Sequence, residues 1–398
     1  MPNDRAISDW ISGFMQLTEN TEPPVSFRLW TAISVVASAL QRKCFVSLGP
    51  KEAGALVFYP NMYILLVGPS AVRKGTAMGP GKRLLTDTGI NLSAEATTRQ
   101  QLIRKFKAVN GSSADPHTGM MHFHSSLTIF SKEFTVFLGY HNHELMSHLC
   151  DWYDCEDEWE YETVARGKEK IIGVWLNLMG ATTPALIQSS MPLDAIGGGL
   201  TSRMIMVYEE KKAKAVYLPI VTAEEAKLYV HLKNDLEKIQ LQRGNHQFTQ
   251  GFIDNWISWR QSQEIKPPDF SDNRFDGYIN RRPNHVIKLC MIFSASERGD
   301  MILKEGDLAR ALAALSQVEV NMPRVFSGVG KSDLASLIPP VAAFIQKRGK
   351  TTVGEIMSVF VHDLDSWTLK NRILQALEDM GDIQIINGKS IQWIEKEG

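Results

Sequence analysis

A phosphate-binding pattern lies near residue 70 of this chain. Residues 61–78 read NMYILLVGPSAVRKGTAM, so an apolar run leads into a glycine-containing turn and then to Lys74. The backbone N–H groups of such a turn and the N-terminus of the next helix attract a polyanion, and the lysine reaches its terminal phosphates. The loop residues that we expect to contact a nucleotide are Gly68, Pro69, Ser70, Ala71, Val72, Arg73, Lys74, Gly75 and Thr76.

The match to the G-x4-G-K-[ST] motif is incomplete. Arg73 occupies the position of the second glycine, and Gly75 occupies the position of the hydroxyl residue. The nearest hydroxyl belongs to Thr76, one residue later. The group that normally binds Mg²⁺ is therefore displaced, or another residue takes its role. A solvent-exposed connection between a strand and a helix is the alternative interpretation of this stretch.

A carboxylate follows the second apolar run of this region. Residues 126–130, SLTIF, predict a buried strand, and Glu133 comes shortly after its end. A carboxylate in this position orients the attacking water or assists Mg²⁺ binding in phosphoryl-transfer sites. The expected Asp–Glu pair is reduced to Glu133, because Lys132 precedes it. A glutamate at the end of a strand is also common in proteins without such a role.

Two further strand ends carry polar residues suited to a nucleotide site. Residues 174–179 predict a third buried strand, and Thr182 and Thr183 after it are placed to sense a γ-phosphate, whereas Asn177 lies inside the strand. Arg203 stands between a glycine-rich turn and a fourth strand. An arginine there can complete the ATP site of a neighbouring subunit, since it stabilises transition-state charge. A surface arginine at the start of a strand is the alternative.

A basic hairpin is predicted between the second and third buried strands. Residues 161–172 alternate around Arg166-Gly167-Lys168, which is typical of a turn. Arg166, Lys168 and Lys170 would then be available to contact nucleic-acid phosphates. Taken alone, the pattern favours a solvated turn over a DNA contact.

Composition limits the classes of protein to consider. The 398 residues are 44% hydrophobic and 22% charged, which is typical of a globular chain of two or three domains. The net charge of −1 means that any nucleic-acid surface must be local. The four scattered cysteines fit reduced thiols, and histidines and cysteines in residues 120–155 lack zinc-site spacing. With no leader and no long apolar segment, we expect a cytoplasmic protein without a membrane partner.

The predicted elements divide the chain into four parts. Residues 1–58 form a helical segment, residues 59–210 an α/β core with a parallel sheet flanked by helices, and residues 211–327 a helical lid. Within the core, residues 93–108 predict a helix and residues 109–120 a polar loop.

The fourth part, residues 333–398, predicts three helices and a hairpin at Asn387-Gly388, which together indicate a winged helix. Lys370 and Arg372 lie on the third helix, where a DNA-reading helix carries its basic groups. Winged helices also bind proteins, so both kinds of partner remain open for this part.

The order of these motifs resembles the core of AAA+ ATPases. The resemblance is closer to the replicative helicases and primase-helicase-like ATPases of phages and prophages. It extends over about residues 20–325 and rests on PNMYILLVGPSAVRKGTA, SLTIFSKEF, NLMGATTP, GGGLTSRMIMV and NRRPNHVIKLCMIFSA. It implies an AAA+ type P-loop ATPase core with ATP and Mg²⁺ as cofactors, and single-stranded or forked DNA as partner.

The resemblance also implies a role for each motif residue. Lys74 would contact the β- and γ-phosphates, Thr76 would replace the usual Mg²⁺ ligand, and Glu133 would activate water with Mg²⁺ nearby. Thr182 or Thr183 would act as sensor 1. Arg203 would be the finger that acts on a neighbouring subunit.

Two features outside these strands complete the carried-over set. Arg281 or Arg282 in the lid would act as sensor 2, in contact with the nucleotide. The hairpin at residues 166–170 matches the place where related helicases have a DNA-gripping hairpin.

The resulting expectation is an ATP-dependent DNA helicase or translocase in the replication of a phage or mobile element. A finger used between subunits requires a heterologous interface that closes into a ring, which we expect to be a hexamer. Two alternatives remain open. One is a slowly hydrolysing helicase loader or assembly protein, as the irregular motifs suggest. The other is a DNA-binding regulator whose activity lies in residues 333–398.

Overall fold

The chain folds into two compact units, Met1–Ser327 and Gly328–Gly398. The computed structural model describes residues 5–50, 53–95, 97–115, 119–163, 167–191, 197–268, 270, 272–326, 333–361, 364–386 and 390–394. The second unit begins five residues before the predicted last domain, residues 333–398. Among the described residues, no helix combines the length and apolar character needed to cross a membrane.

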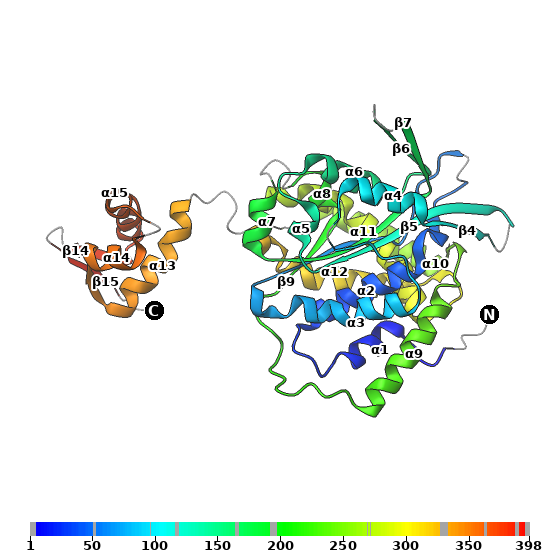
Figure 1. Cartoon of the computed structure of the whole chain (residues 1–398), viewed down its shortest axis with the longest axis horizontal. Helices are drawn as coiled ribbons and strands as arrows, with labels where there is room; N and C mark the ends of the chain where they lie inside the picture. Colours follow the sequence, from blue (N-terminus) through cyan, green and yellow to red (C-terminus); the bar gives the residue numbers. More distant parts are fainter. Residues whose placement is uncertain are drawn as a thin grey trace. The chain divides into compact units, whose positions relative to one another are not determined.

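A five-stranded sheet forms the centre of the first unit (Figure 1). Its order is β4 (Asn110–Ala114), β5 (Met121–Ser131), β8 (Val174–Thr182), β3 (Tyr63–Val67) and β9 (Met204–Tyr208). The last four strands are parallel, and only β4 runs antiparallel, at the edge beside β5. This confirms the predicted mixed α/β fold with a mostly parallel sheet.

The sheet is buried on both faces because its central strands are almost entirely apolar. Every residue of β3 and β8 is buried. The polar exception, Asn177, is fully hydrogen-bonded: its Oδ1 accepts from the N–H of Met62, and its Nδ2 donates to Ser34 and Ser38. In Figure 1 the sheet lies between helices α2 and α3 on one side and α4 and α6 on the other.

Helices connect and cover the strands of this unit. In chain order their bounds are α1 (Trp10–Leu17), α2 (Val25–Leu40), α3 (Lys74–Asp87), α4 (Arg99–Ala108), α5 (Phe134–Leu138), α6 (His143–Asp154), α7 (Pro184–Ser190), α8 (Gly199–Ser202), α9 (Ala223–Ile239), α10 (Gln250–Ile265), α11 (Asp276–Glu297) and α12 (Glu305–Glu319). Short 3₁₀ turns stand at η1 (Gln41–Lys43), η3 (Ser70–Val72), η5 (Asn273–Phe275) and η6 (Met322–Phe326).

Smaller sheets lie around the central one. They consist of β1 (Cys44–Ser47) with β2 (Val57–Phe58) and β10 (Gly244–Asn245), of β6 (Glu158–Thr163) with β7 (Gly167–Ile172), and of β11 (Gln247–Phe248) with β12 (Ile302–Leu303). In addition, residues 91–93 run parallel to β5, since the N–H of Ser93 donates to Thr128 and the N–H of Thr128 donates to Asn91.

The second unit has three helical segments and a three-stranded antiparallel sheet. Its elements are α13 (Asp333–Arg348), β13 (Lys350–Thr352), α14 (Val353–Phe360), the continuous helical stretch of α15 (Ser366–Thr368), η7 (Leu369–Leu374) and α16 (Gln375–Asp379), then β14 (Ile383–Ile386) and β15 (Ser390–Trp393). The sheet order is β13-β15-β14. The predicted helices and hairpin strands are present, while the Asn387-Gly388 turn lies outside the described residues.

Candidate functional site

The predicted phosphate-binding loop connects β3 to α3 through a short turn. Gly68 leaves the strand beside Glu209, and a Cβ at Gly68 would lie only 2.2 Å from the Glu209 carbonyl oxygen. The turn η3 follows and buries Val72, and α3 begins at Lys74. Only glycine fits at residue 68, because the backbone that continues β9 passes so close to it.

Arg73 has a left-handed backbone conformation, which glycine adopts without steric cost. Its φ of 65° and ψ of 33° are left-handed, which costs a non-glycine residue roughly 1–2 kcal/mol. Its guanidinium Nε lies 2.6 Å from Oε2 of Glu22, and Glu22 also pairs with Lys212. The hydrogen bond from Lys212 holds the pKa of Glu22 below its usual range. Substitution of the second glycine therefore changes the loop's side chains more than its course.

Lys74 closes the loop on itself. Its ammonium group donates to the carbonyl oxygens of Gly68 at 2.6 Å and Pro69 at 2.9 Å. Burial lowers the pKa of Lys74, and the charge of Glu133 acts in the opposite direction. A bound phosphate would compete with the two carbonyls for the same ammonium protons.

Glu133 and Lys74 both follow the carboxyl ends of parallel strands, β5 and β3. β5 ends at Ser131, and Glu133 is the exposed residue that precedes α5. Its charge is close enough to act on the Lys74 ammonium group. The structure thus brings together the predicted phosphate-binding lysine and the predicted catalytic carboxylate.

The end of β8 lies between these two groups. Thr182 pairs with Val67 in register, and its carbonyl oxygen accepts from the N–H of Gly68 at 3.3 Å. The Thr183 hydroxyl caps α7 by accepting from the N–H of Leu186. Both threonines therefore border the loop, and Thr183 already has a structural role there.

The residues around the loop do not fit the usual Mg²⁺ site. Gly75 has no side chain where the standard motif has a hydroxyl, and the Thr76 side chain is exposed one position further along α3. Lys132 stands where a metal-binding aspartate is expected. In the described part of the chain, no three His, Cys, Asp or Glu side chains are grouped to hold a metal ion. The loop itself, with Lys74, fits nucleotide phosphates.

Arg203 lies at the amino end of β9, whereas the loop leaves the carboxyl end of the neighbouring strand β3. It directly precedes β9, whose first residue pairs with Tyr63, whereas the loop follows Val67. Four residue steps of strand, about 13 Å at 3.3 Å each, therefore separate the two ends. Burial lowers the pKa of Arg203, but hydrogen bonds to Asp154 raise it overall. Its side chain is 9% exposed and also donates to the carbonyl of Gly199.

The two lid arginines do not reach the loop. Arg281 joins Arg203 at Asp154, with its Nη1 3.4 Å from Oδ1. Arg282 is buried and forms a two-pronged ion pair with Glu319, at 2.6 and 2.9 Å. The expectation that either arginine contacts the nucleotide of its own chain is thus not met by their placement.

The predicted DNA-gripping hairpin is largely neutralised. Strands β6 and β7 form it, and Figure 1 shows it extending beyond the helices around it. Lys168 pairs with Glu160 at 2.8 Å, and Lys170 pairs with Glu158 at 2.7 Å. The two strands carry four glutamates against two lysines. Arg166 lies outside the described residues. The described part of the hairpin therefore offers little positive charge to DNA.

The predicted basic residues of the second unit are both exposed. Lys370 and Arg372 are two residues apart on a helix, so they do not share a face. The guanidinium of Arg372 lies over Trp367, 5.8 Å from the ring centre. Trp367 is 61% exposed and shares the face of Lys370, which the sequence interpretation missed.

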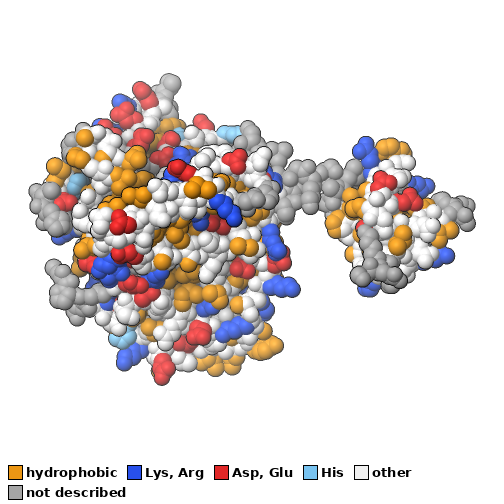
Figure 2. Space-filling view, turned by 180° about the vertical axis from the view of Figure 1, so that it is seen from behind, with side chains coloured by type: hydrophobic (Ala, Val, Ile, Leu, Met, Phe, Trp, Pro, Cys, Tyr) orange, Lys and Arg blue, Asp and Glu red, His pale blue; other side chains and the backbone are white. Residues whose placement is uncertain are grey.

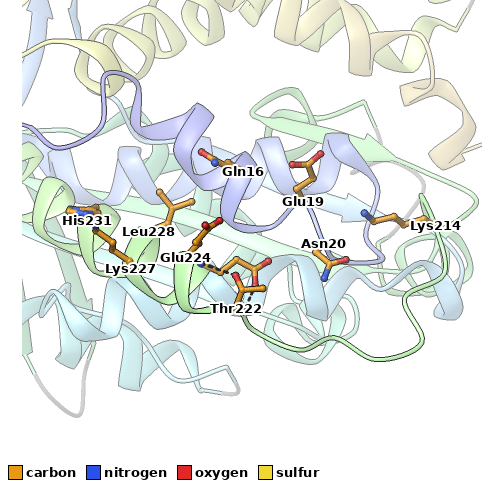
Figure 3. A pocket seen from close by; sticks show the side chains of 10 residues that line it. Gln16, Glu19, Asn20, Lys214, Thr222, Glu224, Lys227, Leu228 and His231 are labelled. Carbon is orange, nitrogen blue, oxygen red and sulfur yellow. Dashed lines mark hydrogen bonds between the residues drawn. The ribbon is translucent and has the colours of Figure 1, made fainter.

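The face of the larger unit in Figure 2 shows no broad basic area among the described residues. On the face in Figure 2, Lys and Arg side chains of the larger unit are interspersed with Asp and Glu. A pocket of about 550 Å³ between α1 and α9 is similarly mixed, because it is lined by Glu19, just after α1, and by Glu224, Lys227 and His231 of α9 (Figure 3). These surfaces do not favour polyanion binding away from the loop.

A more apolar pocket of about 670 Å³ lies beside α3. Pro80 and Arg83 of α3 form one wall, and Ile220, Val221 and Tyr229 form another. Arg83 stacks on the Tyr229 ring at 5.1 Å, and the Tyr229 hydroxyl donates to Asp87. The pocket begins about one and a half helical turns from Lys74.

Comparison with known proteins adds no assignment. No family model matches the chain, and no curated protein is detectably similar to it. The residues that sequence reasoning missed, Glu22, Asp154 and Glu95, are carboxylates that pair with predicted or neighbouring cations. Their only signal was their acidity, because each partner is distant in the chain.

Proposed function

We propose that the first unit is an AAA+ type P-loop ATPase core that binds and hydrolyses ATP. One observation supports the proposal. The charge of Glu133 acts on the Lys74 ammonium group at the carboxyl ends of the parallel strands, and the end of β8 lies between them. This is the arrangement that in-line phosphoryl transfer requires of a cation, a carboxylate and a polar strand end.

The chain's own groups define the steps. The loop N–H groups and the N-terminus of α3 bind the phosphates, and Lys74 exchanges its two carbonyl partners for phosphate oxygens. Glu133 orients a water molecule and accepts its proton as the water oxygen bonds to the γ-phosphorus. The bond from that phosphorus to the β–γ bridging oxygen breaks, which releases ADP and phosphate. The apolar pocket beside α3 would receive the nucleobase, since a neutral planar ring suits its lining.

We further propose that this ATPase drives a DNA helicase or translocase, with the second unit as a winged helix. The order of the motifs, which resembles that of phage helicases, supports this. The placement of Arg203 at the ends of the strands opposite the loop also supports it. An arginine so placed can act only on the ATP of another copy, so the active form would be a ring. Its bonds to Asp154 must open for that role.

A slowly hydrolysing loader is the second candidate. The held position of Arg203 and the neutralised hairpin lysines favour it over a fast motor. In this case ATP binding alone would change the assembly state, and Glu133→Gln would leave that change intact.

ATP hydrolysis with and without single-stranded DNA tests the proposal. We expect Lys74→Ala and Glu133→Gln to lower turnover by at least about 100-fold, since both remove groups that act in the transition state. Lys227→Ala is the matched control, because it removes an exposed lysine that lines the mixed pocket on α9. Binding without turnover would favour the loader, and absence of any ATP binding would refute both candidates.

A further inference from the structure

The two departures from the standard motif, at Gly75 and Lys132, are in contact with each other. A Cβ built on Gly75 would lie 3.6 Å from Cδ and 3.9 Å from Cγ of Lys132. The stem of Lys132 therefore crosses the first turn of α3 at the place where the standard motif carries a hydroxyl side chain. Gly75 replaces the hydroxyl residue and Lys132 replaces the aspartate that would hold Mg²⁺. The Lys132 side chain lies against the place where the hydroxyl side chain would be.

The charge of Lys132 is available for a ligand. Its side chain is exposed, and in the described part of the chain no hydrogen bond or ion pair joins its ammonium group to another residue, although its charge acts on the Glu95 carboxylate. One carboxylate oxygen of Glu95 accepts a hydrogen bond from the backbone N–H of Lys132 at 3.4 Å. Its other oxygen is taken by Lys82 at 2.5 Å. Glu95 thus fixes the backbone of residue 132 while Lys82 balances its charge.

From this contact we propose that Lys132 binds the nucleotide phosphates and supplies the positive charge that Mg²⁺ supplies in the standard loop. The inference rests on the proposed ATP site. Lys74 and Lys132 then approach the phosphates from α3 and from β5, and the chain binds a nucleoside triphosphate without a divalent cation. A lysine at this place also repels a divalent ion, which explains why both of its usual ligands are missing together.

Binding of a fluorescent ATP analogue to the full chain, with Mg²⁺ and with EDTA, tests this inference. For the wild type we expect dissociation constants that agree within about threefold in the two buffers, because side chains of the chain itself, and no metal ion, then bind the phosphates. Lys132→Ala should weaken binding in EDTA by about tenfold, and Lys132→Arg should restore most of the affinity. Lys227→Ala serves as the control for loss of an exposed lysine.

A second variant reverses both departures at once. The double substitution Gly75→Thr with Lys132→Asp restores the usual Mg²⁺ ligands, so we expect its binding to require Mg²⁺. Circular dichroism of each variant checks that it is folded.

Binding of the analogue by the wild type in the two buffers already tests the inference about Lys132. If it binds the analogue only with Mg²⁺, the inference about Lys132 is overturned while the proposed ATP site stands. If it binds in neither buffer, the proposed function itself fails.

Discussion

Arg73 carries a backbone strain that the loop would not have with glycine. Its left-handed conformation is held by the loop and by the ion pair with Glu22, which joins the loop to the N-terminal segment and, through Lys212, to the residues after β9. The pair is partly exposed, so its contribution to stability is small. The conformation, rather than the charge, should dominate the effect of substitutions here.

The order of two substitutions tests this view of Arg73. Both Arg73→Ala and Arg73→Gly lose the ion pair, but only the glycine is relieved of the left-handed strain. We expect Arg73→Gly to be more stable than Arg73→Ala by roughly 1 kcal/mol, the reverse of the order in a helix interior. Thermal unfolding of the two full-length variants measures the difference. An alanine variant at least as stable as the glycine variant would contradict the left-handed conformation.

At the scale of elements, α11 is tied to the sheet by a buried lysine. Lys288 donates to the carbonyl and side-chain oxygens of Asn61, just before β3, and lies 3.8 Å from the Tyr153 ring centre. Burial lowers its pKa from 10.5 to about 8. Between these values the unfolded chain holds a proton that the folded chain has lost, so stability rises with pH across this window.

We therefore expect the wild type to gain stability relative to Lys288→Met between about pH 8 and pH 10. The full difference in pKa corresponds to about 3 kcal/mol. Loss of the Asn61 hydrogen bonds in the variant lowers its free energy of unfolding by the same amount at both pH values. Urea unfolding of the two proteins at each pH gives the comparison. Parallel stability curves would mean that Lys288 keeps an ordinary pKa in the folded chain.

Elements with strong local patterns could be predicted from the sequence, and those defined by pairing could not. The apolar runs of β3, β5, β8 and β9 indicate buried parallel strands, whose carboxyl ends must meet at one edge, so the approach of Lys74 and Glu133 follows. By contrast β4, with the sequence NGSSA, was predicted as a loop, because its strand conformation comes from pairing with β5.

Other predictions failed because local signals were weaker than tertiary contacts. The predicted helix at residues 93–108 begins only at Arg99, since Ser93 bonds to β5 instead. The ion pairs of Arg281 and Arg282 could not be predicted for a similar reason. Their partners, Asp154 and Glu319, are remote in sequence and carry no signal that identifies them.

At the scale of the whole molecule, the separation of Arg203 from Lys74 determines whether one chain can hold a complete site. Arg203 lies at the amino end of β9 and Lys74 follows the carboxyl end of β3, so a site that uses both must combine two copies. Lys74→Ala destroys the loop of its own chain but leaves its arginine, and Arg203→Ala does the opposite. Asp154 keeps Arg281 as a partner in the second variant, so its charge is not left unpaired.

If Arg203 acts on the ATP of a neighbouring subunit, each variant alone should be inactive, and mixing the two should restore ATP hydrolysis. With random assembly from equal amounts, about a quarter of the interfaces join an intact loop to an intact arginine, and we expect about that share of wild-type turnover. Each variant alone, at the same total concentration, is the control, and sedimentation shows whether both still assemble. If the mixture is no more active than its components, Arg203 does not act between subunits. The ion pair with Asp154 would then be its whole role, and the slowly hydrolysing loader would be the better account of the chain.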